Sequence, residues 1–358
     1  MSIDIEPSDW ASLDPWWSTL ERSRSAAHTP ASVRLFDPER LTRRWDEIDS
    51  WWRAHLESAT VADGSTSVRA LRRQQLTDVW DELGPWWDEY AETGYETAVR
   101  IADLLEQSND DWEDSDAPFD ADPLAADLTG RSVSRGPLRP DGEVAWSRWL
   151  AQLLRPSAAL VPELFDVTAS QAPSEVVRED QLSKEEGTFR RPDLLVFYAD
   201  RGISIEVKLG DENYQKTSET AALVERQYGD RHWRHALLLP SRKKERLASI
   251  VDPPLDHGAG DRPTVEWDDP GPIDVLYWRD VTAAIRALLR RGDVVDEHWA
   301  ANAYLFCAVA EQRLVGFQPQ PAIERLAAPG NVVDTIQPIA FADVLEEQLT
   351  YFREVVNL

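Results

Sequence analysis

Two short hydrophobic stretches carry charged side chains in a pattern that can do chemistry. Asp193 follows Pro192 at the start of one stretch, and Glu206 and Lys208 lie two residues apart in the next. Alternate residues of a strand share a face, so Glu206 and Lys208 would project together. Two neighbouring carboxylates repel unless a cation lies between them, and such oxygen ligands suit Mg²⁺. With a lysine to orient or activate water, the pattern indicates metal-assisted phosphodiester hydrolysis.

The turn between the two stretches decides whether these three side chains meet. The sequence ADRG between them is typical of a hairpin turn. If Ala199 pairs with Gly202 across a two-residue turn, Asp193 faces Lys208 and lies diagonal to Glu206, within the roughly 5–8 Å of cross-strand neighbours. A turn one residue longer or shorter would put Asp193 on the opposite face.

The elements around this hairpin are those of an α/β domain. The apolar stripe of DGEVAWSRWLAQLLRPS predicts a helix that Pro156 ends, and SEVVRED, PDLLVFY and ISIEVKL read as strands. A helix over about 216–228 and a buried strand HALLLPS follow. The order helix, three strands, helix, strand predicts an α/β fold with a mixed sheet. Farther along we predict a strand at IDVLYW and helices over 280–291, 296–314 and about 342–355.

The hairpin residues and this order of elements resemble the PD-(D/E)xK nuclease superfamily, which has the restriction-endonuclease-like fold. The resemblance covers about residues 141–240. It implies that Asp193 and Glu206 bind Mg²⁺, or Mn²⁺ in its place, together with the Val207 carbonyl. It also implies that Lys208 is the catalytic lysine and that the products carry 5′-phosphate ends. DNA is the expected substrate, in defence against foreign DNA or in DNA repair.

Members of this superfamily often carry a further acid on the first helix, and Glu143 is the match here. It would bind or tune a metal, although a Glu in the first turn of a helix also simply compensates the helix dipole. The run SRKKER could contact DNA phosphates or form a solvated loop. The candidate substrate-binding residues are Arg190, Arg191, Tyr214, Lys216, Gln227, Arg242, Lys243 and Lys244.

Three other interpretations of the hairpin stay open. Glu206 and Lys208 can form an ordinary surface ion pair, worth at most about 1 kcal/mol. The domain can be a fold relative that has lost catalysis. The protein can also be an interaction module that uses the nuclease fold as a scaffold and its N-terminal part as the binding surface.

The N-terminal part, residues 1–106, contains an internal repeat. Trp10, Trp45 and Trp80 are 35 residues apart, and each is followed six residues later by a pair of tryptophans. Such a period with helical spacing predicts an all-α domain of helical hairpins, in which Gly84-Pro85 marks a helix break. The tryptophans would fill the interior, or else form an aromatic surface for a protein partner or for unstacked bases.

The segment between the repeats and the α/β domain reads as a linker. Residues 107–140 are acidic, then rich in Gly, Pro and Ser, without sustained periodicity. We therefore expect a tether, followed by the nuclease-like domain with its C-terminal helices over residues 141–358.

The composition is strongly acidic and poor in lysine. The 358 residues include 65 acidic and 38 basic ones, a net charge of −27, and the first lysine is Lys184. This resembles proteins of haloarchaea, whose dense cytoplasmic salt screens self-repulsion; an acidic protein from a GC-rich mesophile is the alternative. In the first case the acidity reflects the solvent and does not exclude nucleic acid. An acidic DNA mimic, which would bind no metal, is a further alternative.

The remaining features concern location and partners. A single cysteine, Cys307, excludes an intrachain disulfide and a cysteine metal cluster. The polar start MSIDIEPSDW does not resemble a signal peptide, and no apolar run approaches the roughly 20 residues of a membrane span. We expect a cytoplasmic protein with DNA as its partner and no membrane contact. A protein partner on the repeats and a homodimer are further possibilities.

Overall fold

The structure is a computed structural model whose chain forms two compact units, residues 1–34 and 35–358. All described residues belong to the second unit. They are residues 73–128, 140–165, 167–184, 188–210, 214–243, 247, 249, 251, 255–256, 262–328 and 332–356. Most of the predicted tryptophan repeat therefore lies outside the described residues.

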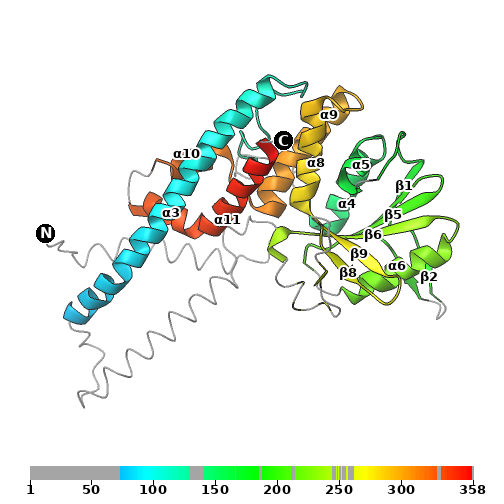
Figure 1. The fold of residues 1–358 in the computed structure, drawn as a ribbon, viewed down its shortest axis with the longest axis horizontal. Helices are drawn as coiled ribbons and strands as arrows, with labels where there is room; N and C mark the ends of the chain where they lie inside the picture. The colour runs from blue at the N-terminus through cyan, green and yellow to red at the C-terminus, as the bar shows by residue number, and fades with distance from the viewer. Residues whose placement is uncertain are drawn as a thin grey trace, which may run out of the picture. The chain divides into compact units, whose positions relative to one another are not determined.

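A seven-stranded mixed sheet forms the centre of the described unit, in the order β1-β4-β5-β6-β9-β8-β7 (Figure 1). Its central pairs, β5 with β6 and β6 with β9, are parallel, and the pairs toward both edges are antiparallel. The strands are β1 (Glu175–Arg178), β4 (Leu194–Phe197), β5 (Arg201–Val207), β6 (His232–Leu239), β7 (Leu255–Asp256), β8 (Thr264–Glu266) and β9 (Pro272–Tyr277). A mixed α/β fold, as predicted, is confirmed.

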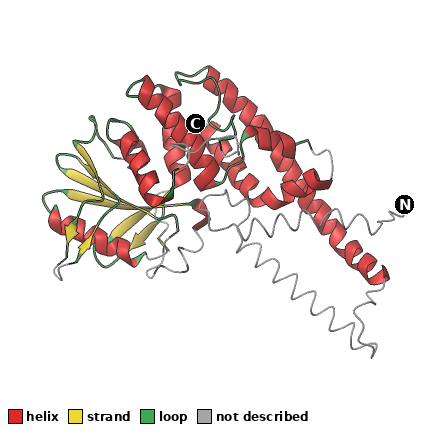
Figure 2. Ribbon diagram, turned by 180° about the vertical axis from the view of Figure 1, so that it is seen from behind, coloured by secondary structure: helices red, strands yellow, loops and turns green. Residues whose placement is uncertain are grey.

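Helices cover both faces of the sheet. One face of β5, formed by Ile203, Ile205 and Val207, packs in the main core with the helices α4 (Gly142–Leu154), α5 (Leu160–Phe165), α8 (Trp278–Arg291) and α9 (Glu297–Ala310). The other face is covered by α6 (Gln215–Gln227), which lies on the opposite side of the sheet from α4 and α5 in Figure 2. Alternation along β5 places Glu206 on the α6 side.

A small two-stranded sheet stands beside α6. It consists of β2 (Leu182–Ser183) and β3 (Phe189–Arg190), which pair antiparallel between β1 and β4 in the chain. The sequence did not predict this insertion, because two-residue strands leave no periodicity to detect.

A second layer of helices packs beside the α/β core. The 41-residue helix α3 (Arg73–Glu113) contacts α10 (Gln320–Leu326) and α11 (Val332–Val356), and the three share a hydrophobic cluster (Figure 1). The C-terminal helices therefore pack against the helix that precedes the α/β domain in the chain. The predicted boundary at residue 141 separates elements that share one core.

Three predictions about these helices are wrong. The expected linker is not a tether over residues 107–128. The helix α3 continues to Glu113, and three side chains of this segment are fully buried: Trp112, Asp122 and Leu124. The expected break at Gly84-Pro85 is absent, since α3 continues through Pro85. The last helix begins at Val332, ten residues before the predicted start, and includes Pro338.

A buried ion cluster joins the two layers. Arg286 of α8 donates to Glu311 at 2.7 Å and to Asp122 at 2.8 Å, and all three side chains are fully buried. Glu311 opens a π-helical turn, Glu311–Val315, and also accepts from Tyr351 of α11 at 2.9 Å. Burial raises the pKa of Asp122, but the charge of Arg286 outweighs it and holds the pKa below its ordinary value. The segment after α3 is thereby fixed to α8.

In the described part of the chain, no helix has both the length and the hydropathy that crossing a membrane requires.

The packing of Trp233 against the hairpin leads to a stability prediction. A Cβ on Gly202 would lie 2.5 Å from the Trp233 ring, which also packs edge-on against Phe197. We expect Gly202→Ala to lower the free energy of unfolding by about 1–3 kcal/mol, measured by urea denaturation. Gly210→Ala is the matched control, because its Cβ would meet nothing within 4 Å. Equal stability of the two variants would contradict the close approach.

Candidate metal-dependent active site

The hairpin register places Asp193 next to Glu206. Phe197 pairs with Gly202 and Leu194 with Ile205, so the next position places Asp193 opposite Glu206. The sequence had predicted a turn centred one residue later, which would put Asp193 opposite Lys208. That register is wrong by two residues, and because two is the strand period, the predicted face is unchanged.

The Asp193 side chain binds the backbone at the end of β5. Asp193 Oδ2 accepts a hydrogen bond of 2.8 Å from the Val207 N–H. The β4–β5 ladder ends at the pair Leu194 and Ile205, so a carboxylate replaces a strand partner at Val207. The Val207 carbonyl lies beyond the end of the same pairing.

Glu206 and Lys208 form an ion pair within this half-buried corner. Lys208 Nζ lies 2.9 Å from Glu206 Oε1, and the two side chains are 8% and 12% exposed. The Lys208 N–H donates to the Leu238 carbonyl of β6, which anchors the chain just after β5 ends. The pair is therefore buried to an extent that a surface ion pair is not, and the interpretation as an ordinary surface pair is wrong.

Glu143 reaches the same corner from the first turn of α4. Its Oε1 accepts from the Leu209 N–H at 2.7 Å and from the Gly210 N–H at 3.5 Å. Its charge acts on the pKa of Asp193, Glu206 and Lys208. The four residues that the sequence singled out thus meet at one end of β5.

The electrostatics of Asp193 and Glu206 would favour a bound cation. Burial and the nearby charge of Glu206 raise the pKa of Asp193 from 3.8 to about 7. Burial also raises the pKa of Glu206, although Lys208 opposes the shift. Two adjacent carboxylates whose charged forms are both disfavoured need an additional positive charge to be ionised together at neutral pH.

Lys208 remains a cation in this environment. Burial alone would lower the pKa of Lys208, but the charges of Glu206, Asp193 and Glu143 outweigh it and raise the pKa above its ordinary value. An ammonium group with a raised pKa does not take up a proton from water at neutral pH. It can donate hydrogen bonds and stabilise negative charge.

The residues present fit a divalent cation held by two carboxylates. Glu206 Oε2 is buried and has no hydrogen-bond partner, which is an unsatisfied position for a hard oxygen ligand. In the described residues no group of three or more His, Cys, Asp or Glu side chains is arranged to hold a metal. The fit therefore rests on Asp193, Glu206 and the Val207 carbonyl, while Glu143 bonds the backbone beside them.

The predicted substrate-binding residues are only partly brought together. Tyr214 is buried immediately before α6, and Lys243 is buried after β6 in the 3-10 turn η2 (Ser241–Lys243). Gln227 is exposed at the last residue of α6, about 18 Å along the helix from its start. It does not join the carboxylates. The Arg242 side chain and Lys244 lie outside the described residues.

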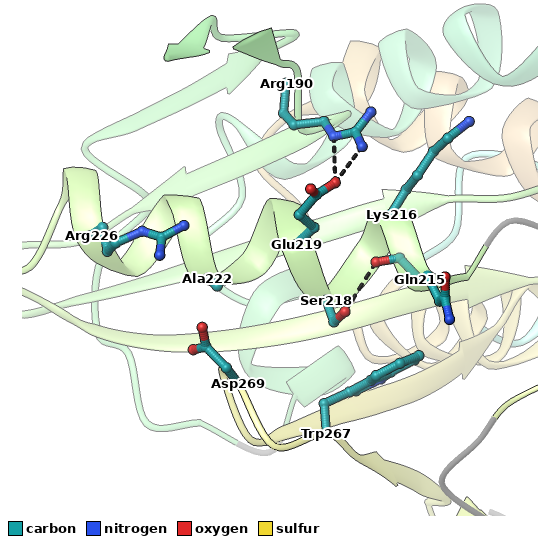
Figure 3. A pocket seen from close by; sticks show the side chains of 9 residues that line it. All are labelled: Arg190, Gln215, Lys216, Ser218, Glu219, Ala222, Arg226, Trp267 and Asp269. Atoms are coloured by element: carbon teal, nitrogen blue, oxygen red, sulfur yellow. Dashed lines mark hydrogen bonds and ion pairs between the residues drawn. The ribbon is translucent and has the colours of Figure 1, made fainter. Parts of the chain in front are cut away.

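Arg190, Arg191 and Lys216 lie on the α6 side, near β3. The Arg191 guanidinium lies 4.9 Å from the centre of the exposed Phe189 ring. Arg190 and Lys216 line an open groove of about 550 Å³ (Figure 3). The complete lining is Arg190, Gln215, Lys216, Ser218, Glu219, Ala222, Arg226, Trp267 and Asp269. None of the four clustered residues at the end of β5 belongs to this lining.

The sequence reading missed several residues of this region. Glu219 and Arg226 recur at helical spacing on α6 with Lys216, a signal that an analysis of the polar face would have found. Trp267 and Asp269 belong to the turn between β8 and β9, about 40 residues beyond α6 in the chain. Only the tertiary structure brings that turn to the helix.

No protein-family model, curated protein or solved structure matches this chain.

Proposed function

We propose that this protein is a Mg²⁺-dependent nuclease of the PD-(D/E)xK type, with DNA as its substrate. The carrying observation is the corner at the end of β5, where Asp193, Glu206, Lys208 and Glu143 meet. The buried Glu206 Oε2, which has no partner, and the raised pKa values of both carboxylates support a cation at this position.

The order of elements supports the same proposal. The elements α4, β1, β4, β5, α6 and β6 follow one another as helix, three strands, helix, strand, apart from the small β2–β3 insertion. Strands β1, β4, β5 and β6 are neighbours in the sheet. This is the order expected of a restriction-endonuclease-like core.

The chain's own residues have distinct roles in the proposed reaction. Asp193 and Glu206 would hold Mg²⁺, with the Val207 carbonyl beside them; bound there, the ion supplies Lewis-acid stabilisation of phosphate charge. Lys208, a cation beside Glu206, donates hydrogen bonds to the attacking water or to a phosphate oxygen and stabilises the developing negative charge. Glu143 positions the backbone after β5 and adds negative charge that favours the cation.

Removal of the lysine charge tests the proposal. We expect Lys208→Gln to slow metal-dependent DNA cleavage by about 10²–10³-fold, since one preorganised donor to the developing charge is lost. The measurement is nicking and linearisation of supercoiled DNA, and degradation of linear DNA, in KCl with Mg²⁺ or Mn²⁺. Arg100→Ala, an exposed residue of α3 that pairs with Glu96, is the control and should cleave like wild type.

Two outcomes would contradict the proposal. If wild type cleaves neither DNA nor RNA in any form with either metal, the nuclease fold would serve as a scaffold, and pull-down partners of the N-terminal part would become the next measurement. If Lys208→Gln cleaves as fast as wild type, the activity would come from a contaminant or from another site.

A further inference from the structure

The groove beside α6 combines positive charge with an aromatic wall. Arg190 enters it from β3, Lys216 and Arg226 from α6, and Trp267 from the turn between β8 and β9 (Figure 3). Its volume is about 550 Å³, within the range of ligand-binding clefts. Three unconnected segments of the chain thus contribute to one concave surface.

The cations are unusual for this chain. In a protein with a net charge of −27, the groove lining contains three cationic and two acidic side chains. Lys184, one of only five lysines in the sequence, also reaches its rim, where it pairs with Glu219. The lining therefore has a net charge of +1 (three cationic against two acidic side chains), although the chain as a whole is acidic.

Trp267 offers a rigid aromatic surface. It is partly buried, packs against the hydrophobic cluster under β6 and β9, and begins a turn closed by its N–H to the Gly271 carbonyl at 3.2 Å. In β3, Phe189 precedes the groove residue Arg190, is 48% exposed and lies under the Arg191 guanidinium, but it is not part of the groove lining. Aromatic side chains along a cationic groove are the features on which unpaired bases stack while phosphates are neutralised.

The groove leads toward the carboxylate corner. Lys216 and Arg226 are ten residues apart on α6, which corresponds to about 15 Å along the helix axis. The helix begins just after the segment that follows β5, and Glu143 bonds the Gly210 N–H in that segment. A strand lying along α6 from Arg226 to Lys216 would therefore run toward the end of β5.

We propose that this groove binds single-stranded nucleic acid, with phosphates on Arg190, Lys216 and Arg226 and a base stacked on Trp267. This inference rests on the proposed function, because it takes the bound single strand to be the substrate that reaches the carboxylates. The binding itself requires neither the metal nor cleavage.

Glu219 pairs with two of the cations at this groove, Arg190 and Lys184. Its carboxylate accepts from Arg190, at 2.9 Å from Nε, and pairs with Lys184 through the other oxygen. The hydrogen bonds from Lys184 and Arg190 lower its pKa, so it is an anion at neutral pH. A phosphate oxygen can replace this carboxylate on the guanidinium, because both accept the same bidentate donors.

The test measures binding without cleavage. Fluorescence anisotropy of a labelled oligo(dT) and of a labelled duplex is recorded with the full chain in EDTA across a series of KCl concentrations. We expect Trp267→Leu, which keeps apolar packing but loses the ring, to weaken oligo(dT) binding about 10-fold, and Trp267→Phe to keep most of it. Arg226→Ala should weaken it and reduce the slope of log K against log salt by about 0.7. Arg100→Ala on α3 is the control for loss of an exposed arginine.

The inference is overturned if wild type does not bind oligo(dT), if Trp267→Leu and Arg226→Ala bind it like wild type, or if both lose duplex binding equally. Should Trp267→Leu fail to fold by circular dichroism, the exposed Arg226 decides alone. Failure of the proposed nuclease function is seen separately, since a wild type that binds oligo(dT) but never cleaves would leave this inference intact.

A second variant tests the exchange of carboxylate for phosphate. Glu219→Gln removes the competing negative charge from Arg190 and Lys184, so we expect oligo(dT) to bind several-fold tighter at low salt. Unchanged or weaker binding would contradict the exchange and would make the Glu219 pairs a structural link between β3 and α6.

Discussion

Asp193→Asn is expected to abolish metal-dependent cleavage and, at the same time, to make the metal-free protein more stable. The asparagine can still accept the Val207 N–H through its amide oxygen, so the end of β5 keeps its hydrogen bond. It cannot supply the negative charge that a divalent cation requires. We expect cleavage to fall by at least about 10²–10³-fold in the plasmid assay.

The gain in stability follows from the raised pKa of Asp193, from 3.8 to about 7. Well below pH 4 the carboxyl is protonated in both the folded and the unfolded chain, and it does not lower the free energy of unfolding. As pH rises from 4 toward 7, the carboxyl loses its proton in the unfolded chain but keeps it in the folded chain. Folding must then take up a proton from increasingly dilute solution, so the free energy of unfolding falls. The stability advantage of Asp193→Asn should therefore grow over this range and level off above about pH 7, at roughly 4 kcal/mol.

Urea denaturation in EDTA at fixed KCl, repeated between pH 4 and 8, measures this difference. Asp200→Asn is the matched control, because Asp200 is an exposed acid in the turn of the same hairpin and bonds Arg201. It should change neither cleavage nor the pH profile appreciably. A stability difference for Asp193→Asn that is absent or shrinks with rising pH would contradict the raised pKa of Asp193, which burial and the charge of Glu206 cause.

Arg286→Met is expected to have the largest effect on stability. The change leaves Asp122 and Glu311 as fully buried carboxylates without their cation. Breaking a buried ion pair by removing one partner costs about 3–5 kcal/mol, because the remaining charge is not solvated. Urea unfolding at fixed pH and salt should show this loss as a lower midpoint with a similar slope.

Two further variants make that result specific. Arg291→Met, which breaks a pair with Glu163 on a side chain 49% exposed, should cost about 0–1 kcal/mol. Adding Asp122→Asn and Glu311→Gln to Arg286→Met should recover part of the loss, since no buried charge is left unpaired. If Arg286→Met and Arg291→Met unfold at the same urea concentration, the buried cluster does not hold the helical layer to the α/β core.

We assign cleavage to the corner at the end of β5 and nucleic-acid binding to the groove beside α6. The corner at the end of β5 has the charged groups and the unsatisfied carboxylate oxygen that a cation needs, but its residues are not among those that line the groove. The groove has cations and an aromatic wall, but among the residues that line it there is no pair of adjacent carboxylates. Binding and cleavage should thus be separable by mutation, which the oligo(dT) and plasmid assays measure independently.

Local sequence patterns were enough to predict the strand faces and several helices of this protein. Period-two alternation in ISIEVKL fixed which side chains share a face, so Glu206 and Lys208 were predicted correctly to project together. A register error of two residues did not matter for Asp193, because it preserves that face. The caps likewise predicted α8 and α9. Gly292 ends α8 in the left-handed conformation, and Gly316 ends the π-helical turn that follows α9.

Contacts between segments far apart in the chain could not be predicted from local patterns. The acidic and then Gly-, Pro- and Ser-rich composition of residues 107–140 predicts a tether. Arg286, 164 residues away in the chain, nevertheless neutralises Asp122 in the interior. Trp267 reaches the groove through the order of strands in the sheet, which no local pattern encodes. The physical reason is that long-range pairing overcomes the preference of a charged side chain for water, and the partner that permits its burial is not its neighbour in sequence.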